Sequence, residues 1–451
     1  MPHARVTALA VLALTSSATP LLANGTVVSA HAVTRSVHAA ATTTVGANAA
    51  NAATAHAARI PAFARKYKIS CSVCHAPVPK LTATGEAFAG NGFEFEVGEE
   101  PRDTVATGDN LLRLQNSVPL GIRMDAYASL LTKSSGGKVA NDLQTPWVMK
   151  LLSGGQISDK ISYYAYFLLG ERGEVGGLED AYIQFTDIRN SGVSVIVGQF
   201  QVSDPLFKRE LRLMYDDYQP YRVRVGKTIA DLTYDRGVMA LWSPWAGGDL
   251  SASVVAGRGL NHANDQRQYD GDNDKNVALR YTQDIGKLRL GMYGYTGREK
   301  QNDRYNQISI WGPDATLALG SKTELNLQYL VRKDDDPFYG TCTTLAPCPG
   351  GHTRAFGTTV KSGFAEAVIS PQGPTGRWFI TGLYNWVQSD DPVVSLRLGE
   401  QATAPGYVSD YRTAAGALHF VYRRNVRMLG EISWDLEREV GRLITGLVVG
   451  F

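Results

Sequence analysis

From about Leu111 to the end of the chain at Phe451, hydrophobic and polar residues alternate with a period of two. Successive side chains of a β-strand point to opposite faces, so this pattern predicts strands with one polar and one apolar face. Clusters of Gly, Asn, Asp and Pro separate the alternating runs and predict turns. The run from 427 to 437 illustrates the two faces: its charged residues are Arg427, Glu431, Asp435 and Glu437, and its apolar residues are Met428, Ile432, Trp434 and Leu436.

Soluble β-sandwiches and membrane barrels both alternate in this way, and three features favour a barrel. Aromatic residues recur near strand ends, as in Trp242 with Trp245, and suit the girdles of a membrane barrel. The last predicted strand, 443–451, resembles the terminal strand of bacterial outer-membrane proteins, which finish on an aromatic residue. The candidate strands number about 16, an even number. We therefore expect an all-β fold, a transmembrane antiparallel β-barrel over residues 108–451.

Strand parity also separates side chains that face the barrel interior from those that face lipid. Asp125 and Glu431 belong to polar rows and are expected to line the lumen. Asp235, Met239 and His419 are expected to face inward by the same argument. Four methionines share a face with apolar neighbours and are expected to contact outer-membrane lipid: Met124, Met149, Met292 and Met428.

An even number of strands places both ends of the barrel on the periplasmic side, beside short turns, with the long loops outside the cell. The long loops are expected at 262–274, 333–359 and 388–409. The segment 204–227 interrupts the alternation and is more helical than extended at its start. Two interpretations remain open for it, an inward fold that narrows the pore and another outward loop.

The first 32 residues have the order of a secretory signal peptide, with Arg5, a short apolar stretch and small residues. Two alternative cleavage sites of the Ala-x-Ala type are predicted, Ala30–Ala32 and Ala55–Ala57. Residues 33–58 are rich in Ala and Thr without periodicity, and we interpret them as a linker or a discarded leader. Export leads to an oxidising compartment, where cysteines need a chemical role. For Cys342 and Cys348, close together in a predicted loop, a local disulfide is favoured over two free thiols.

The other two cysteines belong to Cys71-Ser-Val-Cys74-His75, the C-x-x-C-H pattern of covalent c-type haem attachment. Two thiols at this spacing form thioethers with one porphyrin, and the adjacent His75 supplies the proximal nitrogen to the iron. A redox dithiol or half a zinc site is the alternative, but no second C-x-x-C completes a tetrahedral site. We predict one covalent haem c in a short α-helical cytochrome segment, 59–100, which is too short to enclose the cofactor by itself.

Composition excludes several classes of function. The chain has 451 residues with 45 Lys and Arg against 43 Asp and Glu, a net charge of +2, so it has no basic surplus for nucleic acid. No run of roughly 18 apolar residues follows the first few dozen positions, which argues against a transmembrane helix. The sequence contains no Walker loop, H-E-x-x-H, G-x-S-x-G or dinucleotide fingerprint, so any chemistry is expected at the haem.

A resemblance to a known family covers about 35 residues. The residues that carry it are 60–67, 71–75, Pro79-Lys-Leu, Gly85, Phe88 and Asn91-Gly-Phe93. Together they resemble the N-terminal region of fused outer-membrane monohaem cytochrome-porins of the iron(II)-oxidising type. Beyond these residues the similarity is architectural, one C-x-x-C-H before a single barrel that ends in Phe. The resemblance implies haem attachment at Cys71 and Cys74, proximal ligation by His75, and oxidation of iron(II) outside the cell with electrons passed to periplasmic cytochromes.

The second axial ligand of the haem is left open by the sequence. No methionine lies from Pro2 to Gly121, so His/Met ligation inside the cytochrome segment is excluded. His419 is a candidate distal ligand because its parity points it into the lumen, and an ordinary lumen-lining histidine is the alternative. His56 is a second candidate, which cleavage after Ala57 would remove.

The function expected from these observations is outer-membrane electron transfer, with iron(II) oxidase-like activity if the chain is an enzyme. A small donor such as iron(II) would enter a lumen lined by Asp125 and Glu431, and a periplasmic carrier would dock near Arg65, Lys66 and Lys68. Two alternatives stay open. One is a porin for small solutes whose cytochrome segment acts as a plug, and the other is export of electrons to an extracellular acceptor.

Overall fold

A computed structural model describes residues 62–451 except 101, 103, 134–139, 172, 302 and 397–406. The predicted signal peptide, both candidate cleavage sites, His56 and the whole Ala/Thr-rich tract, 33–58, lie outside the described residues. No helix among the residues that the structure describes is both long and apolar enough to cross a membrane.

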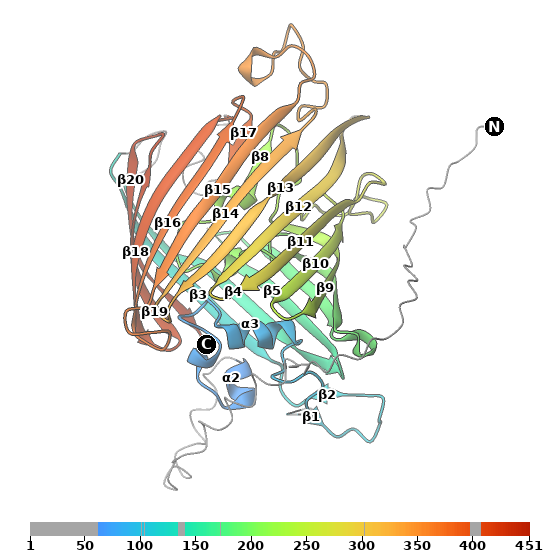
Figure 1. Cartoon of the computed structure of the whole chain (residues 1–451), viewed down its shortest axis with the longest axis vertical. Helices are drawn as coiled ribbons and strands as arrows, with labels where there is room; N and C mark the ends of the chain where they lie inside the picture. Colours follow the sequence, from blue (N-terminus) through green and yellow to red (C-terminus); the bar gives the residue numbers. More distant parts are fainter. Residues whose placement is uncertain are drawn as a thin grey trace, which may run out of the picture. The chain divides into compact units, whose positions relative to one another are not determined.

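A closed antiparallel barrel dominates the described chain (Figure 1). Each of its sixteen described strands pairs with its neighbours along the chain, and β20 closes the barrel on β3, with Ile444 opposite Ser129. The prediction of an all-β antiparallel barrel of this size is confirmed. The strands are β3 (Leu120–Leu131), β4 (Asn141–Ser158), β5 (Ile161–Glu171), β6 (Gly177–Phe185), β7 (Val193–Gln201), β9 (Tyr234–Trp245), β10 (Gly248–Val255), β11 (Asn276–Ile285), β12 (Leu288–Gln301), β13 (Arg304–Leu319), β14 (Thr323–Asp334), β15 (Thr358–Ile369), β16 (Trp378–Ser389), β18 (Asp410–Arg423), β19 (Val426–Asp435) and β20 (Val440–Gly450).

The two faces of the barrel wall follow the predicted parity. Met292 and Met428 are about half exposed on the outer face. Asp235, Met239 and His419 are buried inside, as expected. Polar rows inside and apolar rows outside are the arrangement of a barrel whose outer surface contacts lipid.

One detail of the alternation is corrected by the structure. Glu437 was grouped with the charged row of Arg427, Glu431 and Asp435, but β19 ends at Asp435. Glu437 therefore lies in the turn beyond the strand, where it is exposed and pairs with Arg412. Period-two counting fails there because the chain has left the pleated conformation.

The connections at the two ends of the barrel differ in length. At one end, here called the short-turn end, β4 meets β5 through residues 159–160 and β18 meets β19 through 424–425. At the other, the long-loop end, 335–357 and 390–409 connect successive strands. The start of β3 and the end of β20 both lie at the short-turn end.

Residues 202–233 fold into the barrel, which settles the two interpretations left open by the sequence. This inward segment contains the 3₁₀ turns η4 (Arg209–Leu211) and η5 (Gln219–Arg222) and the short strand β8 (Val223–Val225). Its apolar side chains share one buried cluster with inward residues of the barrel wall. Tyr218 stacks on Phe364 of β15 with ring centroids 4.4 Å apart. Burial of apolar surface against these wall residues favours the inward position.

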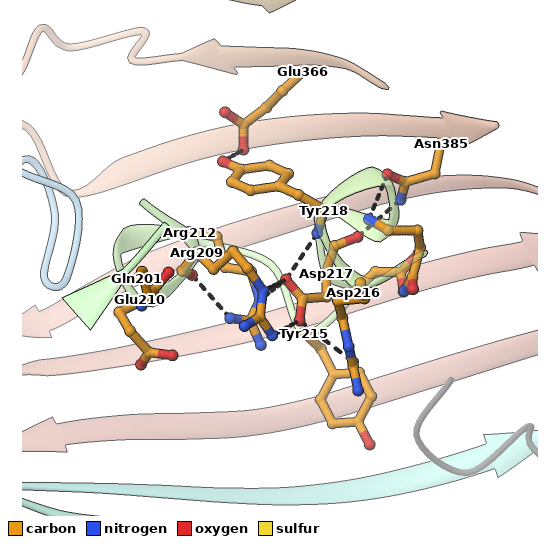
Figure 2. Close-up of polar contacts among 12 residues, drawn as sticks. Gln201, Arg209, Glu210, Arg212, Tyr215, Asp216, Asp217, Tyr218, Glu366 and Asn385 are labelled. Atoms are coloured by element: carbon orange, nitrogen blue, oxygen red, sulfur yellow. Dashed lines mark hydrogen bonds and ion pairs between the residues drawn. The ribbon is translucent and has the colours of Figure 1, made fainter. Parts of the chain in front are cut away.

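Polar contacts hold the inward segment at several points (Figure 2). Tyr218 donates a hydrogen bond to Glu366 of β15 at 2.9 Å. Asn385 of β16 donates to the carbonyl of Asp217 at 3.0 Å and accepts from the Gln219 amide. Arg209 binds the Asp217 carboxylate within the segment. These bonds satisfy buried polar groups, so the segment occupies a defined position against the wall.

At the long-loop end, β8 pairs with β17 (Val394–Leu396), a short strand of the loop after β16. The pair belongs to a second apolar cluster that includes Val223, Val225 and Val394. Cys342 and Cys348 form a disulfide in the neighbouring loop, and Cys342 packs into the same cluster. The inward segment is thus joined to the loops at this end.

The residues before the barrel form a compact segment at the short-turn end. It contains α2 (Ala62–Tyr67), the 3₁₀ turn η2 (Cys71–Val73) and α3 (Ala83–Gly90), followed by the two-stranded ribbon of β1 (Thr104–Val105) and β2 (Leu114–Gln115). Thr82 caps α3 by accepting a hydrogen bond from the Gly85 amide. Five aromatic rings pack together around α3: Phe63, Tyr67, Phe88, Phe93 and Phe95.

Several contacts dock this N-terminal segment, residues 62–100, on the barrel. Phe93 stacks on Tyr164 of β5 with centroids 5.6 Å apart. The Lys80 ammonium lies 2.7 Å from the Glu324 carboxylate of β14. Gln184 of β6 donates to the Gly90 carbonyl at 2.6 Å. Because these contacts come from strands on different parts of the wall, the segment covers part of the barrel mouth.

Candidate functional site

The C-x-x-C-H motif forms one tight turn. The amides of Cys74 and His75 both bond to the Cys71 carbonyl, and Ser70 caps the turn by accepting from the Ser72 amide. Both cysteines are free thiols and partly buried. The turn places Cys71, Cys74 and His75 on the wall of a single cavity of about 320 Å³.

Gly85 explains why α3 packs so closely on this turn. The Cys74 carbonyl accepts the Thr82 amide at 2.9 Å, immediately before α3 begins. A Cβ at position 85 would lie 2.3 Å from the same carbonyl oxygen, which is sterically forbidden. Glycine therefore allows the helix to support the cysteine turn from behind.

His75 is oriented by its own backbone neighbourhood. Its Nδ1 lies 3.0 Å from the Pro79 carbonyl oxygen, which can only accept, so Nδ1 carries the proton and Nε2 keeps its lone pair. Burial lowers the pKa of His75 and favours the neutral ring. A neutral imidazole whose other nitrogen donates to a carbonyl is the usual arrangement of a metal-binding histidine.

Three parts of the chain build the cavity. The N-terminal segment supplies an apolar floor that includes Phe63, Leu81 and Phe88. The barrel contributes parts of β3, β4, β5 and β6 together with the chain end at Gly450 and Phe451. The inward segment closes it with Lys208, Glu210 and Leu211. The cavity therefore exists only in the assembled barrel.

The charged residues of the cavity are already paired. Arg123 binds Asp125 through two bonds of 2.8 and 2.7 Å. Lys150 binds Glu210 of the inward segment, which also accepts from Tyr166 at 3.1 Å. Paired charges and an apolar floor are compatible with a large, mostly apolar ligand.

The donor set of this cavity fits a c-type haem. Two free thiols at the required spacing and an imidazole with an available Nε2 lie on one wall. The volume falls in the range of about 300–1,000 Å³ that small-molecule and cofactor sites occupy. Burial raises the pKa of the Cys71 and Cys74 thiols, so both are protonated at neutral pH in this structure.

Comparison with known proteins bears on the barrel alone. No family model and no curated protein matches the chain. Among solved structures, an anion-selective porin from Comamonas acidovorans matches with a TM-score of 0.51 and 9% identity, over 74% of this chain and 99% of that chain. A loop-deletion mutant of OmpT, an outer membrane protein of Vibrio cholerae, matches with a TM-score of 0.50 and 9% identity, over 74% and 99%.

The barrel has the porin fold. At this identity the likeness concerns the fold, and it extends over 99% of each of the two matched chains while leaving about a quarter of this chain unmatched. The porin-like barrel is therefore the shared part.

The structure does not bring His419 to the cavity. His419 faces the lumen as parity predicts, but it is absent from the cavity wall, and both ring nitrogens are engaged. Arg427 donates to Nδ1 at 2.7 Å, and Nε2 lies 2.8 Å from the Thr381 hydroxyl. This geometry lends no support to His419 as a distal ligand. No methionine and no second histidine lines the cavity within the described chain.

Two lumen carboxylates have structural partners that sequence reasoning did not find. Asp125 is held by Arg123, and Glu431 accepts the Tyr215 and Asp216 amides of the inward segment. Both are buried rather than lining an open channel, and the inward segment contacts Glu431 directly. Of the basic residues expected to attract a carrier, Lys68 is exposed, whereas Arg65 donates to the Leu120 carbonyl at 3.3 Å.

Sequence reasoning also missed the barrel side of the cavity. Lys150 follows Met149, which was expected to face lipid, and no sequence pattern marked Lys150 as a cavity residue. Lys208 and Glu210 lie in the segment whose direction was undecided. Only the fold shows that these residues line the same cavity as the cysteine turn, because they lie far from it along the chain.

Proposed function

We propose that the chain is an outer-membrane cytochrome-porin in which one c-type haem occupies the cavity at the short-turn end of the barrel and passes electrons from an extracellular donor to a periplasmic carrier. The observation that carries the proposal is the convergence of Cys71, Cys74 and the oriented His75 on one wall of that cavity. The family resemblance of the N-terminal segment points in the same direction, and iron(II) is the donor it implies.

The chain's own residues have defined tasks in this proposal. Cys71 and Cys74 would hold the macrocycle through thioethers, and His75 Nε2 would bind the iron. The bound haem supplies reversible one-electron exchange. Phe63, Leu81 and other apolar residues of the floor would exclude water, which favours a higher reduction potential. Export of electrons uses the same parts, because direction depends on the potentials of donor and acceptor.

Anaerobic titration of the protein from outer membranes with iron(II) tests the proposal. We expect the visible band of reduced haem to appear as iron(II) is added. A Cys71→Ser/Cys74→Ser variant should carry no covalent haem, and a Cys342→Ser/Cys348→Ser variant should retain it. Absence of covalent haem from the wild type would overturn the proposal, and reduction by dithionite alone would remove iron(II) as the donor.

A second candidate function is favoured by the fold. The solved structures that match include an anion-selective porin, and this likeness supports solute passage better than it supports electron transfer. In that case the N-terminal segment, docked through Lys80 and Phe93, would act mainly as a plug. Flux of small solutes into liposomes without any donor-driven haem reduction would establish this candidate in place of the first.

A further inference from the structure

One carboxylate beside the cavity lacks hydrogen-bond partners. Asp180 of β6 is 0% exposed, and neither of its carboxylate oxygens accepts a hydrogen bond from the described residues. The Lys208 ammonium lies 3.5 Å from Oδ2, at the distance of a loose ion pair. Buried carboxylates normally accept several hydrogen bonds, so Asp180 retains unused binding capacity.

A second carboxylate shares the same ammonium. Asp204 of the inward segment places Oδ2 2.8 Å from Lys208 Nζ, while its buried Oδ1 has no hydrogen-bond partner in the described chain. Lys208 and Tyr182, which lies two residues beyond Asp180 on β6, line the cavity. The two carboxylates therefore approach one point at the edge of the cavity.

The charges at this point do not balance. Asp180 and Asp204 carry two negative charges when ionised, and Lys208 supplies one positive charge. The nearby Lys150 adds no compensation because it is already paired with Glu210. An uncompensated buried charge is unfavourable, so the cluster is stabilised either by a proton on one carboxylate or by a bound cation.

Oxygen ligands of this kind suit a hard divalent cation. Such ions are held by one or two carboxylates with waters in the remaining positions. No group of three or more His, Cys, Asp and Glu side chains with metal-site geometry occurs in the described part of the chain, so two carboxylates with waters is the arrangement available. The side chains of Asp204 and Lys208 are about one-fifth exposed, at 20% and 22%, and Lys208 lines the cavity, so the site borders the cavity instead of being fully enclosed.

We infer that Asp180 and Asp204 form a divalent-cation site at the edge of the cavity, where the cation takes the position of the Lys208 ammonium between the two carboxylates. The role of the site rests on the proposed function: an iron(II) donor held here would lie beside the cavity that contains Cys71, Cys74 and His75. Lys208 would act as the internal competitor that occupies the carboxylates when no cation is bound.

Binding of Mn²⁺ to the purified full-length protein tests this site without any electron transfer. Free Mn²⁺ would be measured by electron paramagnetic resonance for the wild type and for Asp180→Asn, Asp204→Asn and Lys208→Gln. We expect one Mn²⁺ bound per chain, affinity weakened at least about tenfold by either Asp variant, and affinity strengthened by Lys208→Gln because the competing charge is removed.

Asp235→Asn is the matched control. Asp235 is also an inward, buried carboxylate, but its oxygens accept the Arg236 and Gly257 amides at 2.8 and 2.7 Å. Its replacement should leave Mn²⁺ binding unchanged. Heat-modifiable migration on gels would verify that each variant forms the barrel. The inference is overturned if the wild type binds no Mn²⁺, as a protonated Asp180 would require, or if Asp180→Asn and Asp204→Asn bind it like Asp235→Asn.

Covalent haem measured in the same samples separates the two proposals. Haem present with unchanged Mn²⁺ binding in the Asp variants refutes the cation site and leaves the proposed function standing. Haem absent with Mn²⁺ binding sensitive to Asp180 refutes the proposed function and retains the site as a cation site of the porin-like barrel.

Discussion

At the scale of single residues, the cysteine turn combines local and distant requirements. The spacing of Cys71, Cys74 and His75 is a property of the chain, and the turn closes on the Cys71 carbonyl. The Pro79 carbonyl orients His75 from four residues away. Position 85 must be glycine, and the spacing of the motif does not reveal this. Only the packing of α3 on the turn shows that a Cβ at this position would clash with the Cys74 carbonyl.

The neutral state of His75 predicts a pH dependence of segment docking in the haem-free Cys71→Ser/Cys74→Ser variant. The docked pKa lies below the ordinary value of 6.5. Docking should therefore be constant above about pH 6.5 and weaken below it, because the undocked ring takes up a proton that the docked ring resists. Each unit of difference in pKa corresponds to about a tenfold change in the docking equilibrium. Proteolysis of residues 62–100 at decreasing pH measures this.

The same experiment needs a control for the other groups of the segment that titrate as the pH falls. Adding His75→Gln to the haem-free variant should remove the histidine contribution and leave the background. Identical pH profiles with and without His75 would contradict the prediction.

His419 gives a second residue-scale prediction. Since Arg427 and Thr381 engage both ring nitrogens, His419→Ala should leave the visible spectrum of the bound haem unchanged. We expect some loss of barrel stability, about 1–3 kcal/mol, because Arg427 and Thr381 lose a buried partner. A changed Soret band or potential in this variant would instead make His419 an axial ligand.

At the scale of elements, parity predicts the faces of strands well, because a wall between lumen and lipid imposes a strict period of two. It predicts nothing where the chain leaves the wall. The sequence does not predict the direction of the inward segment, because it suits an inward fold and an outward loop equally. The position of the segment depends on apolar partners such as Phe364 and Leu383 on distant strands. The pairing of β8 with β17 is of the same kind.

The ion pair between Lys80 and Glu324 predicts how firmly the N-terminal segment docks. Lys80→Met should favour undocking by about 1 kcal/mol, roughly fivefold in the opening equilibrium, because Glu324 loses its cationic partner. Although burial opposes it, the Glu324 carboxylate raises the pKa of Lys80, so the pair is charged throughout the neutral range. Protease cleavage within 62–100 measures the change. Lys68→Met, at an exposed lysine, is the control and should behave as the wild type.

At the scale of the whole molecule, the cavity depends on closure of the barrel. The chain end at Phe451 and the start of β3 lie together because β20 pairs with β3, and both line the cavity. The inward segment covers it from within the lumen. A porin-like barrel thus supplies the enclosure that a segment of about 40 residues cannot build for itself.

Removal of the inward segment is expected to open the lumen. Gln201 and Tyr234 face each other at the ends of β7 and β9, so a two-residue Asn-Gly turn can replace 202–233. Because an emptied sixteen-stranded barrel leaves an aqueous channel, solute flux into liposomes should rise severalfold. Shortening the outward loop 262–274 to a comparable turn is the control. Equal flux before and after removal of the inward segment would show that it does not obstruct the pore.

The sequence by itself determined the barrel, the order of its faces and the cysteine motif, because each depends on short-range periodicity or spacing. Only the tertiary structure decided what surrounds the motif. Lys150 and Lys208 line the cavity from separate parts of the chain, and Asp180 lies beside Lys208. The local sequence pattern does not predict the partners of these residues. The physical reason is that burial and charge compensation depend on neighbours in space, and closure of the barrel determines which residues become neighbours.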